Sequence, residues 1–236
     1  MRNRSENQIT VVMIRHGATR LNKEHRYLGR TDEPLSEDGK KEVIKYKQMQ
    51  NYPTVQYLFT SPMKRCLETA DFLYPGKKPV IIPELAEMDF GAFEGKNYLD
   101  LKEDERYQAW IDSNGTLPFP EGESREEFIL RCVSGFQSIV KELTAIEENS
   151  NAEVKTVGMV VHGGTIMALL SRYCGGDYFD YQVSNGSGYI CTLDNWKTEP
   201  TITQIRKIEI AVKCREENEK LVKEIGEIKA EEGSVV

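Results

Sequence analysis

The fold of this 236-residue chain is decided by one stretch near its start, ITVVMIRHG at residues 9–17. Six apolar or β-branched residues follow one another there without polar alternation, which predicts a strand buried on both faces of a parallel sheet. The run stops at Arg15, His16 and Gly17, so we expect these residues in the loop that follows the strand. Further strands are expected at residues 57–60, 80–82, 156–161, 189–193 and 202–208.

Helical patterns lie between these strands. Ser36 and Pro62 each open one helical stretch, and Ser124 with Glu127 forms a capping box ahead of a third. A further helix-like stretch covers residues 99–110. Strands that alternate with helices predict an α/β fold of three layers, α/β/α, with a mostly parallel central sheet.

The domain organisation follows from changes in pattern along the chain. We expect one α/β domain over residues 1–208, with a small lid or insertion at about 84–122, where glycines and prolines interrupt regular structure. Residues 209–236 are highly charged with a helical period, which predicts a charged C-terminal helix or tail.

The composition excludes several classes of protein. The formal net charge is −7, and an acidic chain repels nucleic acid and anionic membranes, so we expect neither as a partner. No apolar run approaches the ~20 residues of a membrane helix. The start is too polar for a signal peptide, and the five cysteines contain no CxxC pair, which favours a reducing cytoplasm.

A phosphate-bearing partner of such a chain must meet a local basic pocket. Residues 1–31 hold seven Arg or Lys against two Glu, so this excess of positive charge surrounds the end of the first strand. The charge pattern therefore favours a small phosphorylated metabolite over a polyanion.

Two of the three histidines occupy matching places, because His16 and His162 each follow a predicted buried strand and each precede a glycine. The carboxyl ends of parallel strands form the crevice where ligands bind, so we expect both imidazoles in one pocket. Arg15, and Arg65 after the second strand, would make this pocket an anion site. The alternative is a pair of structural histidines whose nitrogens bind backbone groups.

The sequence lacks the motifs that other hydrolytic mechanisms and nucleotide binding require. A metal-dependent hydrolase needs several carboxylates beside these histidines, a serine hydrolase needs a G-x-S-x-G elbow, and a nucleotide site needs a P-loop. None of these patterns is present, so we expect neither a metal nor another cofactor.

The site residues belong to a series of blocks that resembles the histidine phosphatase superfamily, also called phosphoglycerate-mutase-like. In chain order the blocks are VVMIRHG at 11–17, Asn22, YLGRTD at 27–32, PLS at 34–36, TSPMKRC at 60–66, LAEMDFG at 85–91, FEG at 93–95, GES at 122–124, Arg131 and VVHGG at 160–164. The resemblance covers about residues 9–195. A single Arg-His-Gly is a weak signal, whereas the blocks in this order are specific.

The resemblance implies a mechanism. His16 would attack phosphorus as a neutral imidazole and form a phosphohistidine, and Glu87 would protonate the leaving alcohol and then activate water. Asp89 is the rival for the role of Glu87. The residues implied to hold the phosphoryl group and substrate are Arg15, Asn22, Gly29, Arg65, His162 and Gly163. Glu94 and Glu123 are expected to have structural roles in a loop and a helix cap.

The resemblance also implies a reaction class. The block at residues 87–95 is most similar to the phosphatase branch, which includes the α-ribazole phosphatases, so we expect a phosphomonoester hydrolase. A phosphoglycerate-type mutase that uses the same phosphohistidine is the first alternative, and a non-catalytic phospholigand-binding protein is the second. Leu28 stands where a polar residue is commoner, which leaves the substrate open, and a homodimer remains open as well.

Overall fold

The structure, a computed structural model, describes residues 7–49, 51–150 and 152–210. Its centre is a six-stranded sheet in the order β3-β2-β4-β1-β5-β6. The strands are β1 (Gln8–Arg15), β2 (Tyr57–Thr60), β3 (Val80–Ile81), β4 (Thr156–Val161), β5 (Gly188–Asp194) and β6 (Thr201–Ile208). Strands β3, β2, β4 and β1 pair in parallel, and β5 pairs antiparallel with both β1 and β6. The prediction of an α/β fold with a mostly parallel sheet is confirmed.

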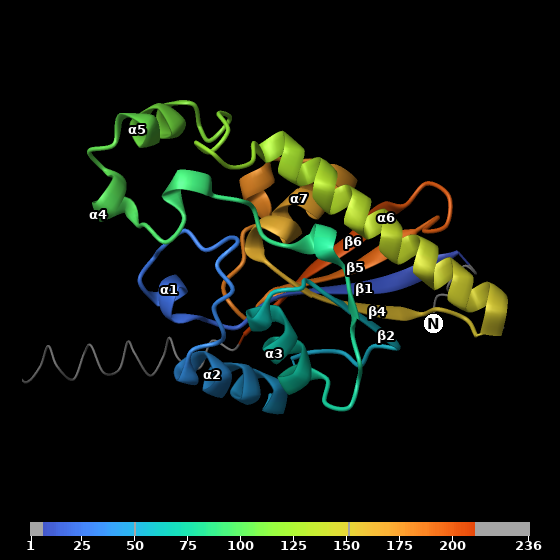
Figure 1. Cartoon of the computed structure of the whole chain (residues 1–236). Helices are drawn as coiled ribbons and strands as arrows, with labels where there is room; N and C mark the ends of the chain where they lie inside the picture. Colours follow the sequence, from blue (N-terminus) through green and yellow to red (C-terminus); the bar gives the residue numbers. More distant parts are fainter. Residues whose placement is uncertain (1–6, 50, 151, 211–236) are drawn as a thin grey trace, which may run out of the picture.

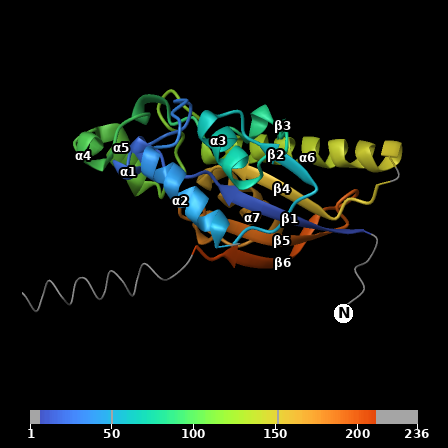
Figure 2. The same ribbon diagram turned by 90° about the horizontal axis from the view of Figure 1, so that it is seen from below.

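Helices cover both faces of the sheet and complete the three layers. One face carries α6 (Arg125–Ser150) and α7 (Gly163–Cys174), and the other carries α2 (Glu37–Gln48) and α3 (Lys64–Leu73) (Figures 1 and 2). Val11 and Met13 pack in the core with residues of α6 and α7, whereas Val12 and Ile14 pack with residues of α2 and α3. Strand β1 is therefore buried on both faces, and each buried side chain of this size contributes about 1.5–3 kcal/mol.

The helix boundaries match the expected start signals in two cases. The Ser36 side chain accepts a hydrogen bond from the Gly39 N–H and caps α2. The capping box of α6 is formed as well, since Glu127 N–H donates to the Ser124 hydroxyl and Ser124 N–H donates to the Glu127 carboxylate.

Three helical regions differ from the expectation. Helix α3 begins at Lys64, two residues after Pro62. The stretch at 99–110 forms two short helices, α4 (Tyr98–Leu101) and α5 (Glu105–Asp112), because the Asp104 side chain caps a new helix. Helix α7 was not expected, since it opens on two glycines, which have low helix propensity, and continues as an apolar run.

The segment expected to be a lid lies at the carboxyl end of β1, β2 and β4 and contains η1 (Pro83–Leu85), η2 (Gly91–Phe93), α4 and α5 (Figure 1). Aromatic rings pack it together: Trp110 lies 4.8 Å from Phe119, and Phe90 lies 5.0 Å from both Phe119 and Tyr27, between ring centroids. Phe93 and Phe119 belong to the same hydrophobic cluster as residues of β1, β4 and α6, so this aromatic segment, residues 84–122, packs onto the main core. Its action as a lid stays a prediction.

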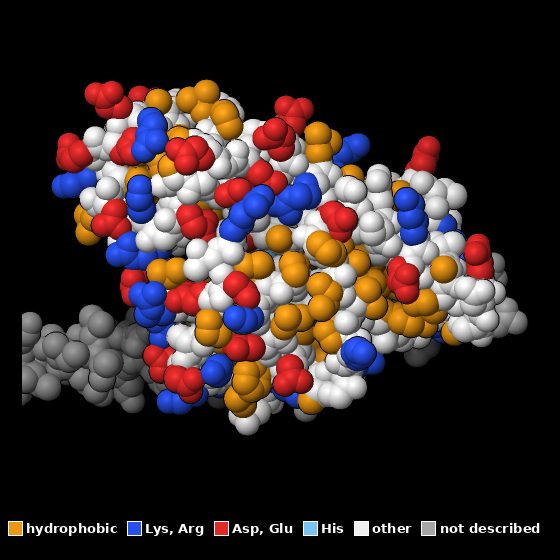
Figure 3. Space-filling view, in the orientation of Figure 1, with side chains coloured by type: hydrophobic (Ala, Val, Ile, Leu, Met, Phe, Trp, Pro, Cys, Tyr) orange, Lys and Arg blue, Asp and Glu red, His pale blue; other side chains and the backbone are white. Residues whose placement is uncertain are grey.

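Two further observations concern the surface. The helices of the described residues include none that combines the length and the apolar character needed to cross a membrane. Acidic and basic side chains are intermixed on the face seen in Figure 3, with hydrophobic side chains gathered across its centre. The expected C-terminal helix lies almost wholly outside the described residues, which end at 210.

Candidate active site

His16 directly follows β1 and is almost fully buried. Its Nδ1 lies 2.7 Å from the Gly17 carbonyl oxygen, so an Nδ1–H that donates there leaves the lone pair on Nε2. Burial, and then the charges of Arg65 and Arg15, lower the pKa of His16 well below 6.5. His16 is therefore a neutral imidazole at pH 7.

His162 follows β4 and is the N-cap residue of α7. Its ring centroid lies 5.2 Å from that of His16, with the rings edge to face, so the structure brings the two histidines together. Its Nε2 lies 2.7 Å from the Ser61 hydroxyl. Burial and the charge of Arg65 lower the pKa of His162 as well.

Arg15 and Arg65 bring two guanidiniums to the same place. Arg65, in the first turn of α3, is fully buried and donates to the carbonyls of Gly29 and Thr31, both at 2.8 Å. Arg15 donates to the Val183 carbonyl at 2.6 Å. Both Nε atoms are buried without a hydrogen-bond partner, and neither guanidinium forms an ion pair with a carboxylate among the described residues. Because an unpaired buried charge is costly, these groups suit an anion such as phosphate.

Glu87 lies opposite these cations and is held by two backbone groups. Its Oε1 accepts from Met88 N–H at 3.0 Å, and its Oε2 accepts from Gly164 N–H at 3.2 Å. Burial nevertheless raises the pKa of Glu87 above its ordinary value. A protonated carboxyl is thus favoured here more than at the surface.

Asp89, the rival acid, lies in a different environment. One of its oxygens is 2.8 Å from Arg30 Nε, and the other accepts from Gly91 N–H at 3.0 Å. Of the two acids, Glu87 lines the central cavity and Asp89 does not.

Asn22, in α1 (Arg20–Lys23), is oriented by its neighbours. Its Oδ1 accepts from Thr19 N–H at 3.2 Å and from Asn185 Nδ2 at 3.1 Å, which directs its own Nδ2 to donate elsewhere. Asn185 also donates to the His16 carbonyl at 3.1 Å. Asn185 was not predicted from the sequence, because a single asparagine ahead of a strand carries no motif.

The two glycines of the predicted site have different places. Gly163 opens α7 and lines the cavity, where a helix N-terminus favours anions. Gly29 lies behind the wall: its N–H donates to Glu94 Oε1 at 2.9 Å, and its carbonyl accepts from Arg65. Gly29 thus links Glu94 to Arg65 and is not among the residues on the wall, and its contact with substrate stays a prediction.

Glu94 and Glu123 both make structural contacts. Glu94 Oε1 also accepts from Thr31 N–H at 2.9 Å, so it fixes the loop whose carbonyls aim Arg65. Glu123 pairs with Arg131 through both of its oxygens, each at 2.7 Å, and accepts from Asp89 N–H.

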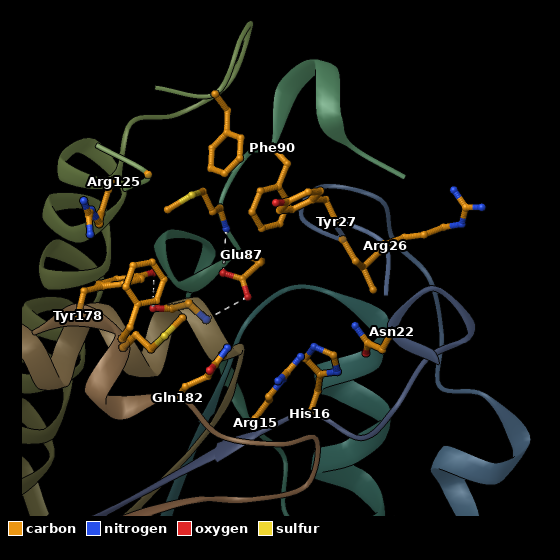
Figure 4. A pocket seen from close by; sticks show the side chains of 18 of the residues that line it. Arg15, His16, Asn22, Arg26, Tyr27, Glu87, Phe90, Arg125, Tyr178 and Gln182 are labelled. Carbon is orange, nitrogen blue, oxygen red and sulfur yellow. Dashed lines mark hydrogen bonds between the residues drawn. The ribbon is translucent and has the colours of Figure 1, made fainter. Parts of the chain in front are cut away.

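The cavity itself has a volume of about 310 Å³ (Figure 4). The predicted residues on its wall are Arg15, His16, Asn22, Glu87 and Gly163, whereas Arg65 and His162 are fully buried beside His16, directly behind the wall. Wall residues that the sequence analysis did not identify as site residues include Tyr27, Phe90, Trp110, Phe119, Arg125, Tyr178, Phe179 and Gln182. Tyr27 and Phe90 lie within two of the blocks that resemble the family, at 27–32 and 85–91. The others lie at 110–125, in η3 (Tyr178–Tyr181) or directly after it, and belong to none of those blocks.

Metal-ligating side chains do not gather at this cavity or elsewhere in the described part of the chain. That part includes no group of three His, Cys, Asp or Glu residues placed to hold an ion.

Curated relatives of this chain include both mutases and phosphatases. It is 27% identical over 186 residues to a "2,3-bisphosphoglycerate-dependent phosphoglycerate mutase" of Bifidobacterium longum, a match that covers 68% of this chain and 75% of the relative. It is 28% identical over 176 residues to "Putative phosphoserine phosphatase 2" of Hydrogenobacter thermophilus, which covers 69% of this chain and 77% of the relative.

The solved structures similar to this chain also include both phosphatases and mutases. An α-ribazole phosphatase from Shigella flexneri matches with a TM-score of 0.63 and 25% identity, covering 87% of this chain and 100% of the other. A phosphoglycerate mutase from Thermus thermophilus matches with a TM-score of 0.59 and 28% identity, covering 86% and 100%. The family described as "Histidine phosphatase superfamily (branch 1)" matches residues 11–205, a span that contains every residue of the site described above. The chain belongs to the histidine phosphatase superfamily.

Proposed function

We propose that this protein hydrolyses a small phosphomonoester through a phosphohistidine intermediate on His16, without a metal or other cofactor. One observation carries the proposal: a neutral imidazole and a carboxyl group of raised pKa face one cavity, beside guanidiniums that lack a carboxylate partner. A nucleophile and a proton donor together are what phosphoryl transfer needs, whereas a binding protein needs only the cations.

The reaction divides into two steps. In the first, His16 Nε2 forms a bond to phosphorus, the bond from phosphorus to the alcohol oxygen breaks, and Glu87 gives its proton to that oxygen. In the second, water attacks phosphorus, the Glu87 carboxylate takes a proton from this water, and the bond to His16 breaks. Arg15, Arg65, Asn22 and His162 stabilise the charge on the phosphoryl oxygens in both steps.

The first test compares the same substitution at two histidines. His16→Asn should lower the rate of p-nitrophenyl phosphate hydrolysis by ~10³-fold or more, because it removes the nucleophile. His25→Asn is the matched control: His25 is exposed, does not line the cavity and has a φ of +54°, which asparagine tolerates. Equal rates in His16→Asn and wild type would exclude His16 as the nucleophile.

A second measurement separates hydrolysis from isomerisation. Wild-type protein given 3-phosphoglycerate is expected to release phosphate, which a colorimetric assay detects. Efficient formation of 2-phosphoglycerate would instead assign the protein to the mutases.

Activity should persist in EDTA, and a loss that a divalent metal restores would contradict the metal-independent route.

A further inference from the structure

We infer that Arg125 is a specificity residue that binds a second anionic group of the substrate, at the end of the cavity away from His16. This inference rests on the proposed function, since it concerns the substrate of the same site. It assigns the substrate to phosphomonoesters with an apolar body and a carboxylate or second phosphate beyond it.

Arg125 lies on the wall of the cavity, away from His16. It is the first residue of α6 and lines the cavity. In Figure 4 its guanidinium and the His16 ring lie on opposite sides of Glu87. A ligand whose phosphoryl group contacts His16 would therefore extend past Glu87 to reach Arg125.

The charge of Arg125 has no carboxylate beside it among the described residues. No carboxylate among the described residues forms an ion pair with it, and its Nη2 reaches the Asn114 carbonyl only at 3.4 Å. Its guanidinium carbon lies 5.7 Å from the ring centres of both Tyr178 and Phe179, which hold it over their faces. Arg26, also on the wall, has by contrast two carboxylate partners, Glu24 and Asp100.

The stability of α6 does not explain an arginine at this position. The N-terminal end of a helix dipole is positive, so a cation at the first position is unfavourable, whereas Glu126 and Glu127 after it suit that end. Arg125 therefore has an unfavourable charge for the start of a helix, and its place on the cavity wall is best explained by a role in binding a ligand.

The cavity wall between His16 and Arg125 is largely apolar. Its side chains there are mostly apolar or aromatic, and include Met88, Phe90, Trp110, Phe119 and Met167. Glu87 is the single acidic residue among the described residues of the wall. The cavity therefore offers cations at both ends and an apolar surface between them.

The experiment measures how selective the site is for an anion at that distance. The probes are phenyl phosphates with a para carboxylate, attached directly or through one or two methylenes, each paired with its neutral carboxamide. The quantity compared is kcat/KM of the acid divided by kcat/KM of the amide. In wild type this ratio should reach about 10–100 for the spacer that fits, the value of a charge-assisted hydrogen bond to an arginine.

Substitutions then assign the selectivity to Arg125. Arg125→Gln should lower the ratio to about 1, mainly through a higher KM for the acid, and Arg125→Lys should keep part of it. Arg172→Gln is the matched control, because Arg172 is exposed in the last turn of α7 and does not line the cavity. A wild-type ratio near 1 for every spacer, or an unchanged ratio in Arg125→Gln, would overturn the inference.

Binding to His16→Asn keeps the two proposals separable. Calorimetric titration of this variant with the same acid and amide pairs should show the same preference, and the double variant with Arg125→Gln should lose it. Selective binding without hydrolysis by wild type would reject the proposed function and support the role of Arg125. His16-dependent hydrolysis without selectivity would reject the role of Arg125 alone.

A 1,4-phenylene bisphosphate that binds more tightly than the acids, through Arg125, would identify the second group as phosphate.

Discussion

At the residue scale, two acids that are two positions apart in the sequence have different environments. Glu87 is buried against the N-terminus of α7 with a raised pKa, and it faces the cavity. Asp89 forms an ion pair with Arg30 and accepts a hydrogen bond from Gly91 N–H. A proton donor must hold its proton near neutral pH, so the geometry favours Glu87 for this role.

Glu87→Gln should therefore lower kcat/KM for an alkyl phosphate by about 10²–10⁴-fold, the usual effect of removing a general acid. The loss should be smaller for p-nitrophenyl phosphate in the phosphorylation step, because nitrophenolate leaves without a proton. Steady-state rates on both esters, with Asp89→Asn alongside, measure the difference. If Asp89→Asn causes the larger loss on the alkyl ester, the proton donor is Asp89.

At the element scale, the start of α7 sets several groups of the site at once. His162 caps the helix, Gly163 lies on the wall, and Gly164 N–H holds the Glu87 carboxylate. A Cβ atom on Gly164 would lie 2.3 Å from Glu87 Oε1, whereas one on Gly163 would lie no nearer than 3.4 Å to Arg15. A side chain at position 164 would therefore require the Glu87 carboxylate to move.

Gly164→Ala should lower kcat/KM by roughly tenfold or more, because the added methyl group displaces the proton donor. Alanine has the higher helix propensity, so the helix itself should not be weakened. Kinetics on an alkyl phosphate, with thermal unfolding followed by circular dichroism, separate the two effects. Gly163→Ala is the comparison and should cost less; wild-type activity in Gly164→Ala would show that Glu87 tolerates displacement.

At the scale of the whole molecule, the site makes the fold sensitive to acid. His16 and His162 are buried with pKa values held well below 6.5 by burial and by nearby arginines. Below pH 6.5 the unfolded chain binds protons at both histidines and the native state does not, so stability falls as the pH falls. Glu87 acts in the opposite sense, because its raised pKa stabilises the native state until the pH rises through that value.

Between pH 7 and 5.5, each buried neutral histidine should lower the free energy of unfolding by about 1 kcal/mol. Urea unfolding at several pH values measures this slope. His16→Asn should remove the contribution of one histidine to this slope. Equal slopes in His16→Asn and wild type would mean that His16 takes up its proton in the native state.

Interactions with other molecules stay predictions at this scale. The net charge of −7 favours a small anionic substrate over nucleic acid or an anionic membrane. A cytoplasmic location and a homodimer are likewise expectations drawn from the sequence alone.

The sequence by itself determined the layers of the fold and the phosphate end of the site. Buried strands, helix caps and the residues that directly follow a strand are local features of a sequence. The stretches ITVVMIRHG and VVHGG therefore predicted the places of Arg15, His16 and His162 without reference to distant residues. Only the tertiary structure decided that Glu87 faces the cavity and Asp89 does not, that Gly29 and Glu94 hold Arg65, and that Arg125 lies on the wall. The physical reason is that these places depend on how the aromatic segment and α6 pack over the end of the sheet. Such packing joins residues far apart in the chain and leaves no local period or motif.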